Sequence, residues 1–222
     1  MSIKKATGTK QLVERYLDAA SNLYGIVPLS KILSIYNSQN DPLTEESFLS
    51  IVDEVSKKHK FFSIVGEDEF YDDVEETKPI DREVVAEHIL AVDDDDYYYF
   101  KEEQSGKPYY VPDKGQFLKY EDEYYHEKTL SFISFRAFLR NIPDFTKEQA
   151  DDLAEDIYGM ADVCEGDVES AVDLIQKYRR YTFSKRDLET FIELFSDMFN
   201  DTRLQINRGF TPREMRNMYY GS

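Results

Sequence analysis

A histidine among carboxylates is the first place in this sequence where metal chemistry could occur. His126 follows Glu123 by three residues and precedes Glu127 by one. On a helix, side chains three and four residues apart share a face, so these three could converge on a divalent cation. No second histidine lies nearby to complete the site, and a histidine ion-paired at the surface is the alternative interpretation. We expect no resident metal or cofactor, and we name Glu123, His126 and Glu127 as the ligands if one binds.

Arginines in the tail are the second group that could do chemistry. Arg203, Arg208 and Arg213 belong to a final stretch that is basic apart from Glu214. An arginine fork can pair with the carboxylates of a neighbouring helix and so fix the tail onto the rest of the protein. The same forks, with the amide groups that begin the last helix, could instead contact an anion or a partner. The pairing role is our first interpretation and the contact role is the second.

Nucleophilic catalysis has little support in the sequence. The chain has one cysteine, Cys164, which excludes an internal disulfide and a cysteine-based zinc site within one chain. Its acidic neighbours disfavour the thiolate that a nucleophile needs. No phosphate-binding glycine loop, no nucleophile with a base and no pair of carboxylates in a defined cleft can be assigned. An enzyme therefore ranks third among the functions considered.

Residues 10–73 are predicted to form a winged-helix-like module, in which three helices and short strands follow one another closely. A first helix ends at Gly25, a short strand covers Ile26 and Val27, and Pro28 opens a second helix. Thr44 caps a third helix. Strands over 61–65 and 69–71, joined at residues 66–68, would then form the wing.

Residues 74–128 are predicted to be an acidic, tyrosine-rich connecting region. A helix is predicted over 81–92. The aromatic runs at 97–100 and 109–112 are predicted to be extended segments on the two sides of a turn. Asp113 is a candidate cap of a short helix.

Residues 129–222 are predicted to form a helical bundle with a basic tail helix. Apolar residues recur at helical spacing in several segments, and Thr146 and Ser184 are predicted to cap two of these helices. Thr211, Pro212 and Glu214 together specify the start of the final helix, and Gly209 before it fits a turn with positive φ. The fold class is therefore mainly α with a small β content, with an amino-terminal winged-helix-like lobe and a carboxy-terminal helical bundle.

Composition limits the class of protein and its partners. The 222 residues are 41% hydrophobic, as in a folded chain, and the formal net charge is −18. Such a charge repels nucleic acid and anionic membranes at long range. No run is long enough to cross a bilayer, and the amino terminus has no apolar core of signal-peptide length, so we expect a cytoplasmic protein without membrane contact.

The tail also resembles that of a group of uncharacterised bacterial proteins. The resemblance lies in residues 200–204, Asn-Asp-Thr-Arg-Leu, and 207–215, Asn-Arg-Gly-Phe-Thr-Pro-Arg-Glu-Met. Shorter likenesses lie at 23–27, 35–37 and 117–120. Some members continue into a cysteine-rich zinc motif similar to the one that ends the SecA translocation ATPase, but this sequence stops at Ser222 without that motif and has Phe210 where histidine is common. The resemblance therefore implies a family and an architecture, and it leaves the function open.

These observations lead to two functional hypotheses. The first is a non-enzymatic cytosolic adaptor or regulatory protein that acts through an unidentified protein partner. The second is a nucleic-acid-binding regulator that uses the winged-helix module. The predicted third helix and wing are rich in acids, whereas a DNA-binding module needs basic residues there to neutralise phosphates, so the first hypothesis is favoured.

Overall fold

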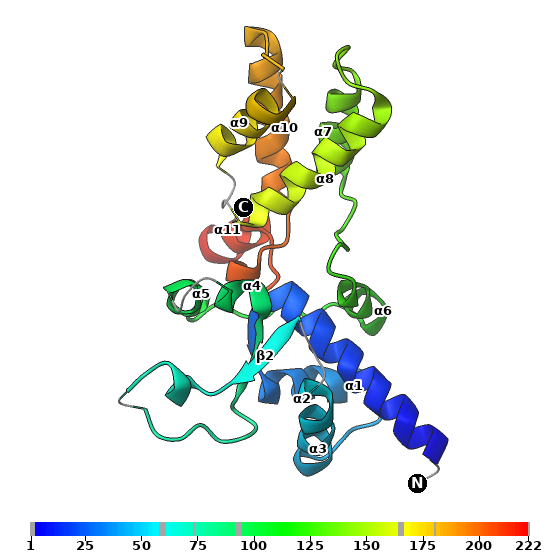
Figure 1. The fold of residues 1–222 in the computed structure, drawn as a ribbon, viewed down its shortest axis with the longest axis vertical. Helices are drawn as coiled ribbons and strands as arrows, with labels where there is room; N and C mark the ends of the chain where they lie inside the picture. The colour runs from blue at the N-terminus through cyan, green and yellow to red at the C-terminus, as the bar shows by residue number, and fades with distance from the viewer. Residues whose placement is uncertain are drawn as a thin grey trace. The chain divides into compact units, whose positions relative to one another are not determined.

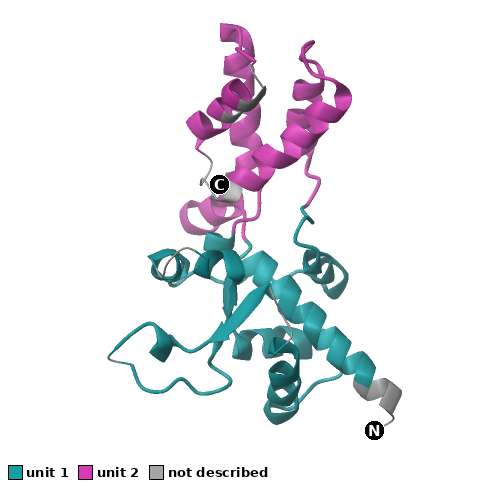
Figure 2. Ribbon diagram, viewed as in Figure 1, with its two compact units in different colours: residues 1–126, 205–209 teal, residues 127–204, 210–222 magenta. Residues whose placement is uncertain are grey.

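The computed structural model of the protein describes residues 3–57, 61–72, 74–91, 95–163, 167–179 and 181–221. The described chain is mainly helical with one small antiparallel sheet, which confirms the predicted fold class. It divides into two compact units (Figure 2). Unit 1 contains residues 1–126 and 205–209, and unit 2 contains residues 127–204 and 210–222.

Unit 1 begins with the order helix, strand, helix, helix, strand, strand (Figure 1). Short helices follow the last strand, and a 3-10 turn from the tail completes the unit. The elements are α1 (Ile3–Tyr24), β1 (Ile26–Pro28), α2 (Leu29–Gln39), α3 (Glu45–Ser56), β2 (Phe62–Val65), η1 (Glu67–Glu69), β3 (Glu83–Ala86), α4 (Glu87–Leu90), α5 (Asp95–Gln104), α6 (Lys114–Phe117), η2 (Leu118–Glu121) and η3 (Gln205–Asn207).

The three strands form an antiparallel sheet with the order β1-β3-β2. Val84 of β3 lies opposite Val27 of β1 and Ile64 of β2. Successive side chains point to opposite faces of a strand, and here both faces are covered. Val27 and Val84 belong to the core formed with α1, α2 and α3, while Ile26 and Val85 pack with Ile89 and Tyr97 on the other face.

Two sequence predictions in and after the predicted wing are wrong. Residues 69–71 do not form the return strand, because Glu67–Glu69 is a 3-10 turn and the third strand is β3. The helix predicted over 81–92 is reduced to α4. All four residues of β3 are buried because the strand is the central one of the sheet, so they lack the alternation that marks a half-buried strand.

The aromatic run at 97–100 is also helical, not extended, because it belongs to α5. Tyr97 is fully buried there, and its hydroxyl donates a hydrogen bond of 2.9 Å to Glu83. The Lys101 ammonium bonds the same carboxylate at 2.8 Å and Glu67 at 2.7 Å. Glu83 is only 4% exposed, so these contacts provide the partners that a buried carboxylate requires.

The regular elements described in unit 2 are all helices: α7 (Leu130–Arg140), α8 (Lys147–Val163), α9 (Val168–Arg179), α10 (Lys185–Asn200) and α11 (Pro212–Tyr220). Phe132 and Phe135 of α7 pack with Ile157 of α8, Ile175 of α9 and Phe191 of α10 in one apolar core. The predicted caps are confirmed, since the side chains of Thr146, Ser184 and Thr211 each accept a bond from the amide three residues later. Cys164 lies outside the described residues.

The unit boundaries differ from the predicted divisions 10–73, 74–128 and 129–222. Residues 74–126 belong to unit 1, because β3 completes its sheet and η2 packs along α1. Residues 205–209 also belong to unit 1, although the tail on both sides of them belongs to unit 2. The chain therefore returns to unit 1 near its end.

Candidate partner-binding site

The predicted metal ligands lack the helical arrangement that the prediction required. Residues 122–129 lie outside helices, and His126 is buried in unit 1 at 8% exposure. Glu127 belongs to unit 2, where its carboxylate accepts a bond of 2.9 Å from Arg203 Nε. Within the described part of the chain, no three His, Cys, Asp or Glu side chains are grouped closely enough to hold a metal ion. The structure therefore does not bring Glu123, His126 and Glu127 together as a metal site.

Arg203 is held inside unit 2 by two carboxylates. Besides the bond to Glu127, its NH1 donates to Glu214 Oε2 at 3.0 Å, and its side chain is only 11% exposed. The same Oε2 accepts a bond of 2.9 Å from the backbone amide of Thr211, as part of the capping box of α11. Arg203 thus links Glu127, the first residue of unit 2, to the start of α11. This arrangement is the one expected if the arginine pairs with carboxylates of its own protein.

Arg213 and Arg208 also contact groups of the protein. Arg213 Nε donates to Asp201 at 2.6 Å on the surface of unit 2. Arg208, in unit 1, donates to the Lys107 carbonyl at 2.6 Å and lies over the Tyr109 ring, with 4.5 Å between the guanidinium carbon and the ring centroid. The arginines are therefore placed by separate contacts, and no shared anion site is formed by Arg203 and Arg213 in unit 2.

Residues 205–209 are fixed in unit 1 by buried hydrogen bonds, which sequence reasoning missed. Gln104, at 2% exposure, donates to the carbonyls of Tyr24 and Gln205 at 2.6 and 2.9 Å. The Gln205 amide donates to the Asn22 carbonyl at 3.0 Å. The sequence signal was the glycine at 209, whose φ of +81° brings the tail against Leu23.

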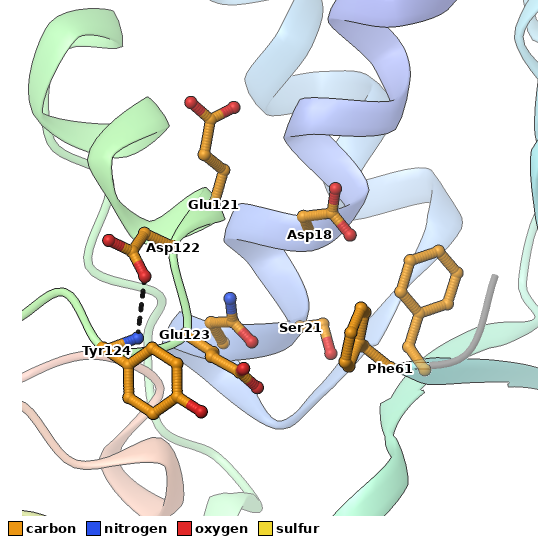
Figure 3. Close-up of a pocket in the computed structure, with 9 residues that line it drawn as sticks. Asp18, Ser21, Phe61, Glu121, Asp122, Glu123 and Tyr124 are labelled. Atoms are coloured by element: carbon orange, nitrogen blue, oxygen red, sulfur yellow. Dashed lines mark hydrogen bonds between the residues drawn. The ribbon is translucent and has the colours of Figure 1, made fainter.

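A cavity of about 260 Å³ lies in unit 1, next to α1 and to the turn after η2 (Figure 3). Asp18 and Ser21 reach it from one face of α1, because they are three residues apart. Its lining residues are Asp18, Ser21, Asn22, Phe61, Phe62, Glu121, Asp122, Glu123 and Tyr124. Among these nine described residues four are carboxylates and none is basic, so the cavity is strongly negative.

The carboxylates of the cavity interact with neighbouring groups of the protein. Arg15 donates to both carboxylate oxygens of Glu121, and the NH2 bond is 2.9 Å long. The Asp122 carboxylate accepts the amide of Tyr124 at 3.0 Å, which fixes the turn (Figure 3). A hydrogen bond with Glu123, and then the charge of that carboxylate, raise the pKa of the Tyr124 hydroxyl. Glu123 is thus part of the candidate site, although for a different reason from the predicted metal binding.

Exposed aromatic rings border the same cavity. Phe61 is 62% exposed and Tyr124 is 82% exposed, and Figure 3 shows them on opposite sides of Ser21. Aromatic side chains supply much of the contact area in protein interfaces, so two exposed rings at one cavity mark a candidate binding surface. No pattern in the sequence singles out Phe61, Asp18 or Ser21, because they come together only through the fold.

Ser21 has an unused polar atom at this cavity. Its residue is 1% exposed, and its buried hydroxyl has no hydrogen-bond partner in the structure. A buried hydroxyl without a partner costs free energy, so native proteins normally satisfy it with protein, water or a ligand. Ser21 is therefore an available donor and acceptor at the wall of an acidic cavity.

The surface that would contact nucleic acid in a DNA-binding module is acidic. The connection from β2 to β3, residues 66–82, contains eight acids and two bases. One of these bases, Arg82, donates to the Ile64 carbonyl at 2.5 Å. On α3, Glu54 pairs with Lys10 at 2.6 Å, and Glu45 and Glu46 lie in the first turn. Such a surface opposes phosphate binding.

Comparisons of the chain with protein-family models, curated proteins and solved structures found no match. Among the described helices, none combines the length and the apolar character needed to cross a membrane.

Proposed function

We propose that this protein is a non-enzymatic cytosolic adaptor or regulatory protein that binds another protein through unit 1. The observation that carries the proposal is the cavity beside α1, where Phe61 and Tyr124 are exposed next to a group of carboxylates. Exposed aromatic rings with a polar surround are typical of protein-binding patches. In this proposal the rings and carboxylates of the site bind a surface of the partner protein, and the negative charge of the site favours a partner with basic residues.

The framework that presents this site is, in our proposal, a winged-helix-type module. Its support is the order α1, β1, α2, α3, β2, β3 with the sheet order β1-β3-β2. Modules of this kind bind either nucleic acid or protein, so the order alone does not decide the function. The acidic α3 and β2–β3 connection favour a protein partner.

A nucleic-acid-binding regulator is the second candidate function, because the same element order occurs in DNA-binding modules. Its binding would depend strongly on salt, since phosphate neutralisation supplies most of the affinity. The two candidates therefore differ in a measurable property.

The test is affinity capture with the full chain from a bacterial lysate, the source that the resemblance of the tail implies. Parallel samples are treated with nuclease or left untreated, and the recovered proteins are identified by mass spectrometry. We expect a defined protein to be recovered equally from both samples. Recovery that disappears with nuclease, together with salt-sensitive binding to duplex DNA, would replace the adaptor proposal with the nucleic-acid one.

A further inference from the structure

We infer that the cavity lined by Asp18, Ser21 and Glu123 binds a lysine or arginine side chain from a basic segment of the partner protein. The inference rests on the proposed function, because it names the chemistry that the adaptor recognises. A volume of about 260 Å³ is below the range of about 300–1,000 Å³ that is usual for small-molecule sites, and it suits a single side chain.

The cavity provides the acceptors that a basic side chain needs. An ammonium carries three N–H donors and a guanidinium five, and neither can accept a hydrogen bond. Asp18 and Glu123 supply carboxylate oxygens, and Ser21 supplies the buried hydroxyl that has no partner in the structure. A bound cation would satisfy this hydroxyl and neutralise part of the negative charge.

The aromatic rings suit the same ligand. A cation within about 6 Å of an aromatic ring face is attracted by the ring quadrupole. Phe61 and Tyr124 present such rings on two sides of Ser21, and they can also pack against the methylene stem of the incoming side chain (Figure 3). An anionic or purely apolar ligand would gain nothing from the carboxylates.

The protein itself shows that a guanidinium can be accommodated at this edge. Arg15 does not line the cavity, but its guanidinium donates hydrogen bonds to both carboxylate oxygens of Glu121, which does line it. Arg15 is one cation against the four carboxylates that line the cavity, so the charge of these five described residues remains negative. The excess predicts a binding rate that rises as the ionic strength falls.

The experiment is an NMR titration of the full chain with a short peptide that has Lys-Arg-Lys at its centre and glycine and serine on both sides. A peptide with Gln-Gln-Gln at its centre is the control. We expect the basic peptide to shift the amide signals of Ser21, Asn22 and Glu123, and the glutamine peptide to leave them unchanged. Shifts confined to other parts of unit 1 would overturn the inference.

Two charge variants separate the cavity from general electrostatics. The double variant Asp18→Asn/Glu123→Gln should weaken binding of the basic peptide by about tenfold or more, which corresponds to about 1.4 kcal/mol. The control variant Glu76→Gln removes an exposed carboxylate that does not line the cavity, and it should change the affinity by less than about twofold. Equal weakening per charge in both proteins would contradict a specific site.

A Ser21→Ala variant tests the hydroxyl directly. The change removes a buried polar group without a partner, so the free energy of unfolding should stay constant or rise. Peptide affinity should fall severalfold, because one acceptor is lost. An unchanged affinity, or a clear loss of stability, would show that the hydroxyl does not serve the ligand.

Failure of this inference differs from failure of the proposed function. If affinity capture recovers a nuclease-resistant partner equally on the wild type and on the Asp18→Asn/Glu123→Gln variant, the adaptor proposal stands and the cavity inference is wrong. If no partner is captured and the basic peptide does not bind, both are wrong.

Discussion

At the scale of the residue, several side chains that suggest chemistry in the sequence have structural partners in the fold. Arg203 contacts Glu127 and Glu214, while Arg208 contacts a carbonyl and a tyrosine ring. These contacts are intramolecular, and no sequence pattern announces the distant partner Glu127. The residues that gather at the cavity carry the recognition chemistry in our proposal.

The pairing role of Arg203 predicts a loss of stability when the side chain is removed. Arg203→Ala should lower the free energy of unfolding by about 2–3 kcal/mol, since bonds to charged groups are lost and two carboxylates lose their cation. Thermal and urea unfolding measure the change.

Arg213→Ala is the matched control for Arg203→Ala. Its side chain is 48% exposed and pairs with surface carboxylates, so the loss should be below about 1 kcal/mol. An Arg203→Ala protein as stable as the wild type would rule out the structural role and restore anion or partner contact as the function of this arginine.

At the scale of the element, features that depend on residues close together in the sequence were predicted correctly. Features that depend on contacts between distant residues were not. The caps at Thr44 and Thr211 were predicted correctly because a cap involves residues only three apart. Strand β3 was not readable, since its burial depends on β1 and β2, and its glutamate is neutralised by Lys101 of α5. Helix α5 was missed because an aromatic run favours strands unless tertiary packing overrides that preference.

Two glycines with positive φ allow a test of the tail's return to unit 1. Gly106 and Gly209 have φ values of +71° and +81°, but a Cβ at Gly106 would meet nothing within 4 Å, whereas one at Gly209 would lie 3.0 Å from Leu23 Cδ1. Both alanine variants should lose about 1–2 kcal/mol for the backbone conformation. Gly209→Ala should lose more in urea unfolding, and an equal loss would mean that the tail does not pack there as described.

The contact between α5 and β3 predicts sensitivity to alkaline pH. Burial, and then the charge of Glu83, raise the pKa of the Tyr97 hydroxyl. The unfolded chain releases this proton near pH 10 while the folded one retains it, so the stabilisation is present below about pH 10 and is lost as the pH rises above that value. The urea concentration at the midpoint of unfolding should therefore decrease as the pH is raised from 8 to about 10.5.

Tyr97→Phe is the control for this pH dependence. The variant should be less stable at pH 8, because Glu83 loses a donor, and it should lose less stability than the wild type between pH 8 and about 10.5. Identical pH dependence in both proteins would show that Tyr97 is not the group responsible.

At the scale of the whole molecule, the sequence predicted the class of fold and disfavoured some classes of partner. The mainly helical fold followed from periodicity, and the net charge of −18 disfavoured nucleic acid and anionic membranes as partners. The division into two units could not be predicted, because residues 205–209 join unit 1 through Gln104, Tyr24 and Asn22, which are distant in the sequence. The cavity has the same origin, since α1, the start of β2 and the turn after η2 all contribute to it.

The most direct test of the adaptor proposal is nuclease-treated affinity capture, performed in parallel with the wild type, Asp18→Asn/Glu123→Gln and Glu76→Gln. We predict that the wild type and Glu76→Gln recover the same protein, and that recovery on the double variant falls severalfold because the acidic cavity beside α1 is neutralised. The absence of any nuclease-resistant protein from the wild-type sample would contradict the proposal that this chain acts through protein contacts.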